Sequence, residues 1–87
     1  TVVAAPDGRV RLARAGDDRL ATAGTGDVLT GIVAALLAGG LDPLDAAAVG
    51  AHVHGLAGRA GPRHGTVASD VIDGIPAALG HLLGDER

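Results

Sequence analysis

The sequence predicts an α/β fold in which a β-hairpin is followed by three helices. An Asp-Gly pair separates two short runs with the composition of strands, which is a strong hairpin signal. Apolar residues then recur at the spacing of a single helical face, and the later segments begin with residues that commonly start helices. With 87 residues, the chain is expected to form one domain at most.

The N-terminal part of the chain is expected to form the hairpin. Strands are predicted at residues 1–5 and 9–13, with Pro6, Asp7 and Gly8 as the turn between them. The first strand opens with β-branched residues, and the second alternates arginine with apolar side chains. Glycine at the end of the turn allows the positive φ that tight connections require.

A glycine-rich stretch leads directly into the first predicted helix. Gly24, Thr25, Gly26 and Asp27 stand immediately before or at the start of an apolar segment expected to be helical over residues 27–38. The first N–H groups of a helix lack intrahelical partners and carry the positive end of its dipole, and glycine allows an anion to approach closely. The stretch therefore predicts a phosphate-binding turn. In such a turn Asp27 either stabilises the start of its own helix or accepts a proton from an attacking hydroxyl.

The spacing of these glycines does not match two common phosphate motifs. No lysine is present, which excludes a P-loop, and a third glycine at the dinucleotide-binding spacing is missing. As a bare pattern, the stretch is more often a plain glycine turn with Asp27 as a capping carboxylate.

The remaining helices are predicted from their start and stop signals. Gly39 and Gly40 end the first helix, as glycines commonly do. Asp42 fits the N-cap and Pro43 the first position of a second helix, which is expected to run to Ala57 before a loop at residues 58–65.

The last predicted helix contains a breaker. Ser69 is expected to cap it, and Pro76 is expected to kink or split it. The tail after Leu83 is expected to fray.

Two histidines on the second helix raise the question of a metal site. His52 and His54 are two residues apart, so on a helix their side chains point to nearly opposite sides and cannot chelate one ion. Packing, or a place beside a pocket, is the favoured interpretation, and no metal ligand is predicted in the chain.

Composition excludes several classes. The chain has no cysteine, which rules out a disulfide framework and a thiolate metal site. Its net charge is −3 and it has no aromatic residue, so nucleic acid is not an expected partner. Its longest apolar run is far shorter than the roughly 20 residues that span a bilayer, and no signal peptide is visible, so a cytoplasmic protein without a membrane partner is expected.

Beyond single residues, the segment at residues 20–32, Leu-Ala-Thr-Ala-Gly-Thr-Gly-Asp-Val-Leu-Thr-Gly-Ile, resembles the glycine-rich signature of the ribokinase-like superfamily. The likeness is closest to the ADP-dependent NAD(P)H-hydrate dehydratase family, chiefly because of residues 40–58. It extends to further short segments, which are 1–4, 6–8, 54–58 and 68–72. The resemblance implies that residues 1–87 are a single partial domain, the C-terminal part of a ribokinase-like three-layer fold, inactive on its own.

The resemblance also implies an activity. The family uses ADP or ATP, with Mg²⁺, to remove water from hydrated NADH and NADPH. Asp27 would bind the substrate hydroxyl and act as the general base. Gly24, Thr25 and Gly26, together with the Asp27 amide, would hold the transferred phosphate, and Thr1 would be a further nucleotide contact. A homo-oligomer, or association with the rest of the fold, is expected.

Two alternatives remain open from the sequence. One is a small-molecule kinase of the same superfamily that phosphorylates the hydroxymethyl group of a vitamin precursor. The other is a helical interaction module without chemistry, because alanine- and glycine-rich helices also serve to pack against a partner.

Overall fold

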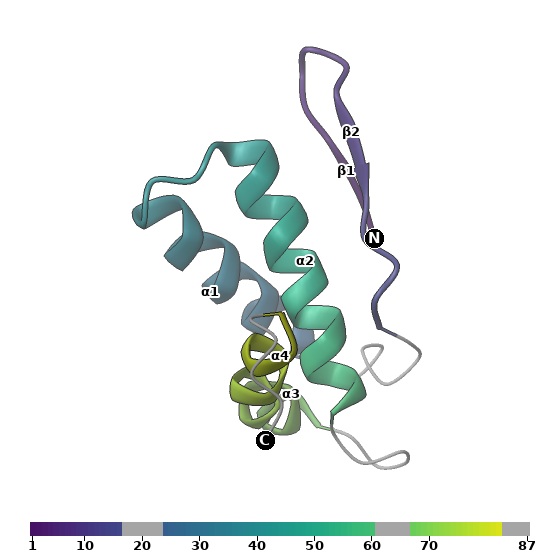
Figure 1. Ribbon diagram of the computed structural model, residues 1–87, viewed down its shortest axis with the longest axis vertical. Coiled ribbons are helices and arrows are strands. Elements are labelled where there is room, and N and C mark those ends of the chain that lie inside the picture. The colour runs from purple at the N-terminus through teal and green to yellow at the C-terminus, as the bar shows by residue number, and fades with distance from the viewer. Residues whose placement is uncertain (17–23, 61–66, 83–87) are drawn as a thin grey trace.

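The long helix α2 is the centre of the molecule, with the hairpin on one side and the other helices on the opposite side (Figure 1). The computed structural model describes residues 1–16, 24–60 and 67–82. The elements are β1 (Val2–Ala4), β2 (Val10–Leu12), α1 (Thr25–Ala38), α2 (Pro43–Arg59), α3 (Ala68–Asp73) and α4 (Ile75–Leu82). The described part is thus a predominantly helical unit with a two-stranded antiparallel hairpin.

The predicted hairpin is confirmed. Val2 pairs with Leu12 and Ala4 with Val10, and the turn closes through a hydrogen bond of 3.0 Å from Gly8 N–H to the Ala5 carbonyl. Gly8 has a φ of 94°, the left-handed conformation that the Asp-Gly signal anticipates. The two strands are each one residue shorter at either end than predicted.

The predicted junction between the first two helices is also confirmed. Gly40 has a φ of 99° and donates to the Leu37 carbonyl at 3.0 Å, while Leu41 donates to the Leu36 carbonyl at 3.2 Å. These two bonds form a Schellman motif, which satisfies carbonyls that the end of α1 would leave without partners.

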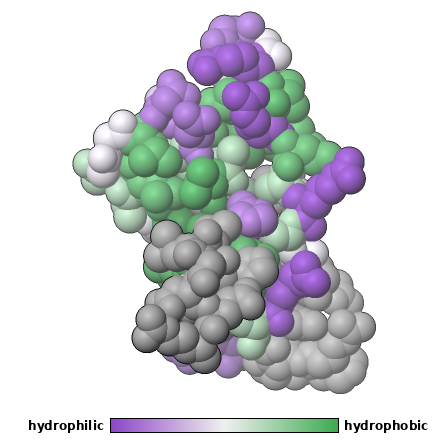
Figure 2. Space-filling view, viewed as in Figure 1, coloured by the Kyte–Doolittle hydropathy of each residue, from purple (hydrophilic) through white to green (hydrophobic). Residues whose placement is uncertain are grey.

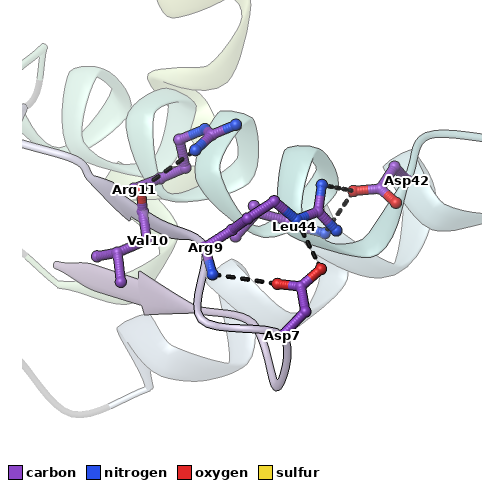
Figure 3. A network of polar contacts seen from close by, with 6 residues as sticks. All are labelled: Asp7, Arg9, Val10, Arg11, Asp42 and Leu44. Atoms are coloured by element: carbon purple, nitrogen blue, oxygen red, sulfur yellow. Dashed lines mark hydrogen bonds and ion pairs between the residues drawn. The ribbon is translucent and has the colours of Figure 1, made fainter.

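Helix α2 begins as expected from its sequence. The Asp42 carboxylate accepts the Leu44 N–H at 3.1 Å, and Pro43 occupies the first helical position, where no N–H is needed. A polar network joins this N-cap to the hairpin turn (Figure 3), because Arg9 pairs with Asp7 at 2.8 Å and lies 4.0 Å from Asp42. The predicted loop from residue 58 starts too early, because α2 continues to Arg59, and residues 61–66 lie outside the described part.

The last predicted helix is split, as the sequence predicts, but its start differs from expectation. It is divided into α3 and α4 at Gly74, two residues before the predicted breaker Pro76 in the first turn of α4, so four helices are described rather than three. Ser69 is not the cap: it lies inside α3, whose N-cap is Val67. The carboxylate of Asp70 accepts the Val67 N–H at 2.8 Å and satisfies that end of the helix instead. The expected fraying of the tail lies outside the described residues.

The core is small and lies where α2 meets α3 and α4. Its buried members are Val53, Ala57, Val71 and Ala78, with Val28, Ile32, Leu56 and Ile75 packed around them. The apolar stripe predicted for α1 faces this core but is only half-buried. The opposite side of α1, with Thr30 and Gly31, is exposed.

Glycine allows two close backbone approaches to α2. A Cβ at Gly55 would collide with the backbone of Ala15, which follows β2, and a Cβ at Gly74 would collide with the carbonyl of Ala57. The absence of a side chain at these positions therefore sets how closely the hairpin segment and the α3–α4 corner pack on α2.

Much apolar surface stays exposed. Figure 2 shows hydrophobic residues gathered over α1 and along the hairpin, with hydrophilic residues at the hairpin tip. On the hairpin, the exposed large residues are Val2, Val10 and Leu12, which share one face of the sheet. None of the helices in the described ranges is long and apolar enough to cross a membrane.

Candidate functional site

The glycine-rich turn forms the start of α1, as the sequence predicts, but the helix begins at Thr25 rather than Asp27. Asp27 is therefore the third helical residue and its side chain is exposed. Gly24 is the N-cap, with a φ of 91° and a ψ of −11°. The left-handed conformation of Gly24 brings Thr25 and Gly26 into the helix two residues earlier than the apolar pattern suggested.

The backbone of this turn is only partly satisfied by the helix itself. The Gly24 carbonyl accepts the N–H of Asp27 at 3.2 Å and that of Val28 at 3.4 Å. Gly26 is the second helical residue, and at this position no carbonyl four residues back belongs to the helix. No side chain caps α1, since its N-cap is glycine. The Gly26 amide thus remains the best placed of the predicted phosphate-binding amides to donate to a ligand.

Helices α2 and α3 hold the turn from outside. The ring of His54 on α2 is only 6% exposed, and its Nε2 lies 2.8 Å from the carbonyl oxygen of Thr25. A Cβ on Gly24 would lie 3.2 Å from the Cβ of Ala68 in α3. The turn is therefore packed between two helices that follow it in the chain.

Asp27 stands at the edge of an apolar cavity of about 410 Å³ between α1 and the α3–α4 corner. The cavity is lined by Asp27, Val28, Gly31, Ile32, Ile72 and Ile75. A single carboxylate beside apolar walls is suited to a ligand that presents an apolar ring and one hydroxyl group, because ordered polar groups are few in such pockets and fix orientation.

The predicted nucleotide contact Thr1 and the two histidines of α2 lie at different places in the structure. Thr1 is at the open end of the hairpin, where its amino group donates to the Ala13 carbonyl at 3.0 Å. His52 lines a second cavity, of about 300 Å³, between the hairpin and α2, whereas His54 is buried at the turn. Among the residues that the structure describes, no three His, Asp or Glu side chains are grouped to hold a metal ion.

Sequence reasoning missed the contacts that complete this site. The link from His54 to Thr25 joins residues 29 positions apart, and Ile72 and Ile75 reach the cavity from α3 and α4. The local sequence carries no signal for such contacts, apart from a histidine set among small residues on a buried helix face.

The known proteins that this chain resembles in sequence carry names that refer to NAD(P)H-hydrate. The family model for NAD(P)H-hydrate dehydratase matches residues 1–76. The chain is 46% identical over 86 residues to the bifunctional NAD(P)H-hydrate repair enzyme Nnr of Moorella thermoacetica, a match that covers 94% of this chain and 16% of that protein. It is 41% identical over 80 residues to the ADP-dependent (S)-NAD(P)H-hydrate dehydratase of Neisseria meningitidis, covering 90% of this chain and 27% of that enzyme. The chain thus spans a minor part of the length of these relatives.

Proposed function

The chain belongs to the NAD(P)H-hydrate dehydratase family, and we propose that it supplies the phosphoryl-transfer end of an enzyme that dehydrates hydrated NADH and NADPH at the expense of ADP or ATP. One observation carries the assignment of roles to residues. Asp27 is an exposed carboxylate beside the partly unsatisfied first turn of α1, and it lines an apolar cavity.

The proposed chemistry uses the Asp27 carboxylate as a base and the amides of the turn as hydrogen-bond donors to the phosphate. Asp27 accepts the proton of the substrate hydroxyl as the hydroxyl oxygen bonds to the terminal phosphorus of the nucleotide. The bond between that phosphorus and its bridging oxygen breaks, and the nucleotide leaves with one phosphate fewer. The amides of Thr25, Gly26 and Asp27 stabilise the negative charge on the phosphoryl oxygens. The phosphorylated ring then loses phosphate as its C–O bond breaks, and a proton leaves the ring to restore the double bond.

The Asp27 amide has the smallest share in this scheme, because it already donates to the Gly24 carbonyl at 3.2 Å. We assign the main phosphate contact to Gly26, with Gly24 allowing close approach and Thr25 beside it. Thr1 stays a predicted nucleotide contact. Mg²⁺ would neutralise the nucleotide phosphates, but the described residues offer no cluster of ligands for it, so no step here depends on it.

The three-layer ribokinase-like architecture is part of the proposal. The exposed apolar face of the hairpin, formed by Val2, Val10 and Leu12, is consistent with coverage by further layers of such a fold or by another copy of the chain. Because these 87 residues match only 16% and 27% of the two relatives' length, we expect them to show no turnover on their own.

A chimera tests the proposed activity. Residues of this chain replace the matched 80-residue stretch of the Neisseria enzyme, and turnover of hydrated NADH with ADP is followed by the appearance of NADH and free phosphate. Asp27→Asn is expected to lower kcat by about 10²–10⁴-fold, the usual contribution of a general base.

Asp45 offers a matched control. It is also an exposed aspartate at the third position of a helix, α2, but it does not line the cavity of Asp27. Asp45→Asn is expected to leave kcat unchanged, with circular dichroism showing that both variants fold. Equal turnover of the two variants would contradict the role of Asp27.

Product analysis separates the dehydratase from the kinase alternative. A dehydratase releases NADH and inorganic phosphate, whereas a kinase leaves a stable phosphate ester. An interaction module without chemistry would give neither product and would tolerate Asp27→Asn.

A further inference from the structure

His54 is a buried histidine of α2 beside the glycine-rich turn, and the proposed chemistry gives it no task. His54 is 6% exposed and its Nε2 lies 2.8 Å from the Thr25 carbonyl oxygen. A polar ring this deeply buried costs free energy unless it is hydrogen-bonded, so the contact is an integral part of the packing between α1 and α2.

The chemistry of the contact fixes the proton on the ring. A carbonyl oxygen can only accept a hydrogen bond, so Nε2 must carry the hydrogen and donate it. Both the neutral Nε2–H tautomer and the doubly protonated ring satisfy this requirement.

The hydrogen bond from His54 bears on the phosphate site because its acceptor, the Thr25 carbonyl, belongs to the same peptide group as the Gly26 N–H. The carbonyl of Thr25 and the N–H of Gly26 are two ends of one planar unit, and the described backbone contains no cis peptide bond. In a trans peptide the two groups point in opposite directions. When His54 holds the Thr25 oxygen toward α2, the Gly26 N–H is therefore directed away from α2.

The peptide group between Thr25 and Gly26 has little local restraint on its orientation. Gly24 and Gly26 lie on either side of Thr25, and glycine has the greatest backbone freedom. No side chain caps α1, and at the position of Gly26 no carbonyl four residues back belongs to the helix. A hydrogen bond donated to the carbonyl also polarises the peptide and strengthens its N–H as a donor.

We propose that His54 is a positioning residue that aims the Gly26 N–H at the transferred phosphate by holding the Thr25 carbonyl. The proposal rests on the proposed function for the presence of a phosphate at this turn. It assigns to His54 no contact with substrate, and it gives a reason for a histidine on the buried face of α2, where the other buried residues are apolar or glycine.

The test measures phosphate binding at one amide of the ¹⁵N-labelled 87-residue chain. Inorganic phosphate is titrated while the Gly26 amide signal is followed in wild type, His54→Leu and His54→Gln. Leucine fills a similar volume without a donor, whereas the glutamine amide places an N–H at a comparable reach. We expect His54→Leu to weaken the apparent phosphate affinity about fivefold to tenfold and His54→Gln to restore most of it.

Val53→Ala is the control for a general loss of stability. Val53 neighbours His54 in the chain and is 3% exposed in the core, so its truncation destabilises the fold without touching the Thr25 carbonyl. Val53→Ala is expected to bind phosphate as wild type does. Unchanged affinity in His54→Leu, or an equal loss in all three variants, would overturn the proposal.

A second measurement separates this proposal from the proposed function. The ¹⁵N shift of the His54 ring reports whether Nε2 is protonated, and it needs no ligand. If wild type does not respond to phosphate, the phosphate-binding role of the turn fails. A protonated Nε2, together with a changed chemical shift of the Gly26 amide in His54→Leu, would then still support the positioning of the peptide by His54. An Nε2 without a proton would refute it.

Discussion

The N-termini of α1 and α2 are stabilised in different ways, one by contacts from other helices and the other by its own side-chain cap. Helix α2 is capped by the Asp42 carboxylate, which accepts the Leu44 N–H at 3.1 Å, and it begins with a proline that has no N–H. Helix α1 has glycine as its N-cap and no side-chain cap, and its support comes from His54 and Ala68 on other helices. Both helices carry aspartate at their third position, at Asp27 and Asp45.

This difference separates a structural helix start from one suited to a ligand. A helix that satisfies its own first amides has little left to offer an anion. A helix whose first turn is held from outside, by a hydrogen bond to a carbonyl and by close packing at a glycine, keeps amides available for an anion. The comparison predicts that substitutions at the two starts will have different consequences for stability and for binding.

The largest effect on stability is expected at the N-cap of α1. Gly24→Ala places a Cβ at a φ of 91° and 3.2 Å from the Ala68 Cβ, so the free energy of unfolding is expected to fall by about 1–3 kcal/mol. Gly26→Ala is the matched control, since a Cβ there meets nothing within 4 Å and the backbone is helical. It is expected to be neutral or to stabilise by up to about 1 kcal/mol. Urea denaturation measures both, and equal losses would contradict the distinction drawn between the two glycines.

The next effect is expected at the cap of α2. Asp42→Ala removes the acceptor of the Leu44 N–H and is expected to lower the free energy of unfolding by about 1 kcal/mol, whereas Asp42→Asn retains a cap and most of the stability. The phosphate response of the Gly26 amide is expected to be the same in both. A changed response would mean that the two helix starts are coupled, against the separation argued above.

The smallest effect is expected for the ion pairs beside that cap. The Arg9 and Asp7 side chains are both about half exposed, and Arg9 is 4.0 Å from Asp42. Arg9→Ala is therefore expected to cost less than about 0.5 kcal/mol, and less still in high salt. Asp7→Ala is expected to cost more, because the Asp7 carboxylate also accepts the Arg9 backbone N–H in the turn at 3.1 Å. Denaturation of both variants at two salt concentrations tests this order.

Local signals determined much of what the sequence alone predicted. The Asp7-Gly8 turn, the Gly39-Gly40 stop and the Asp42-Pro43 start all appear where they were expected, because each depends on backbone preferences within a few residues. The same applies to the location of the glycine-rich turn at the start of a helix. Ser69 failed as a cap because Asp70 satisfies the start of α3 from inside the helix.

Tertiary structure decided how that turn is held and what surrounds it. The sequence contains Gly24 and His54 without indicating that one faces Ala68 and the other the Thr25 carbonyl. The apolar cavity beside Asp27 needs Ile72 and Ile75 from a distant part of the chain. Contacts of this range follow from how helices pack on α2, which short-range preferences do not specify, and they turn a glycine-rich start of a helix into a candidate site.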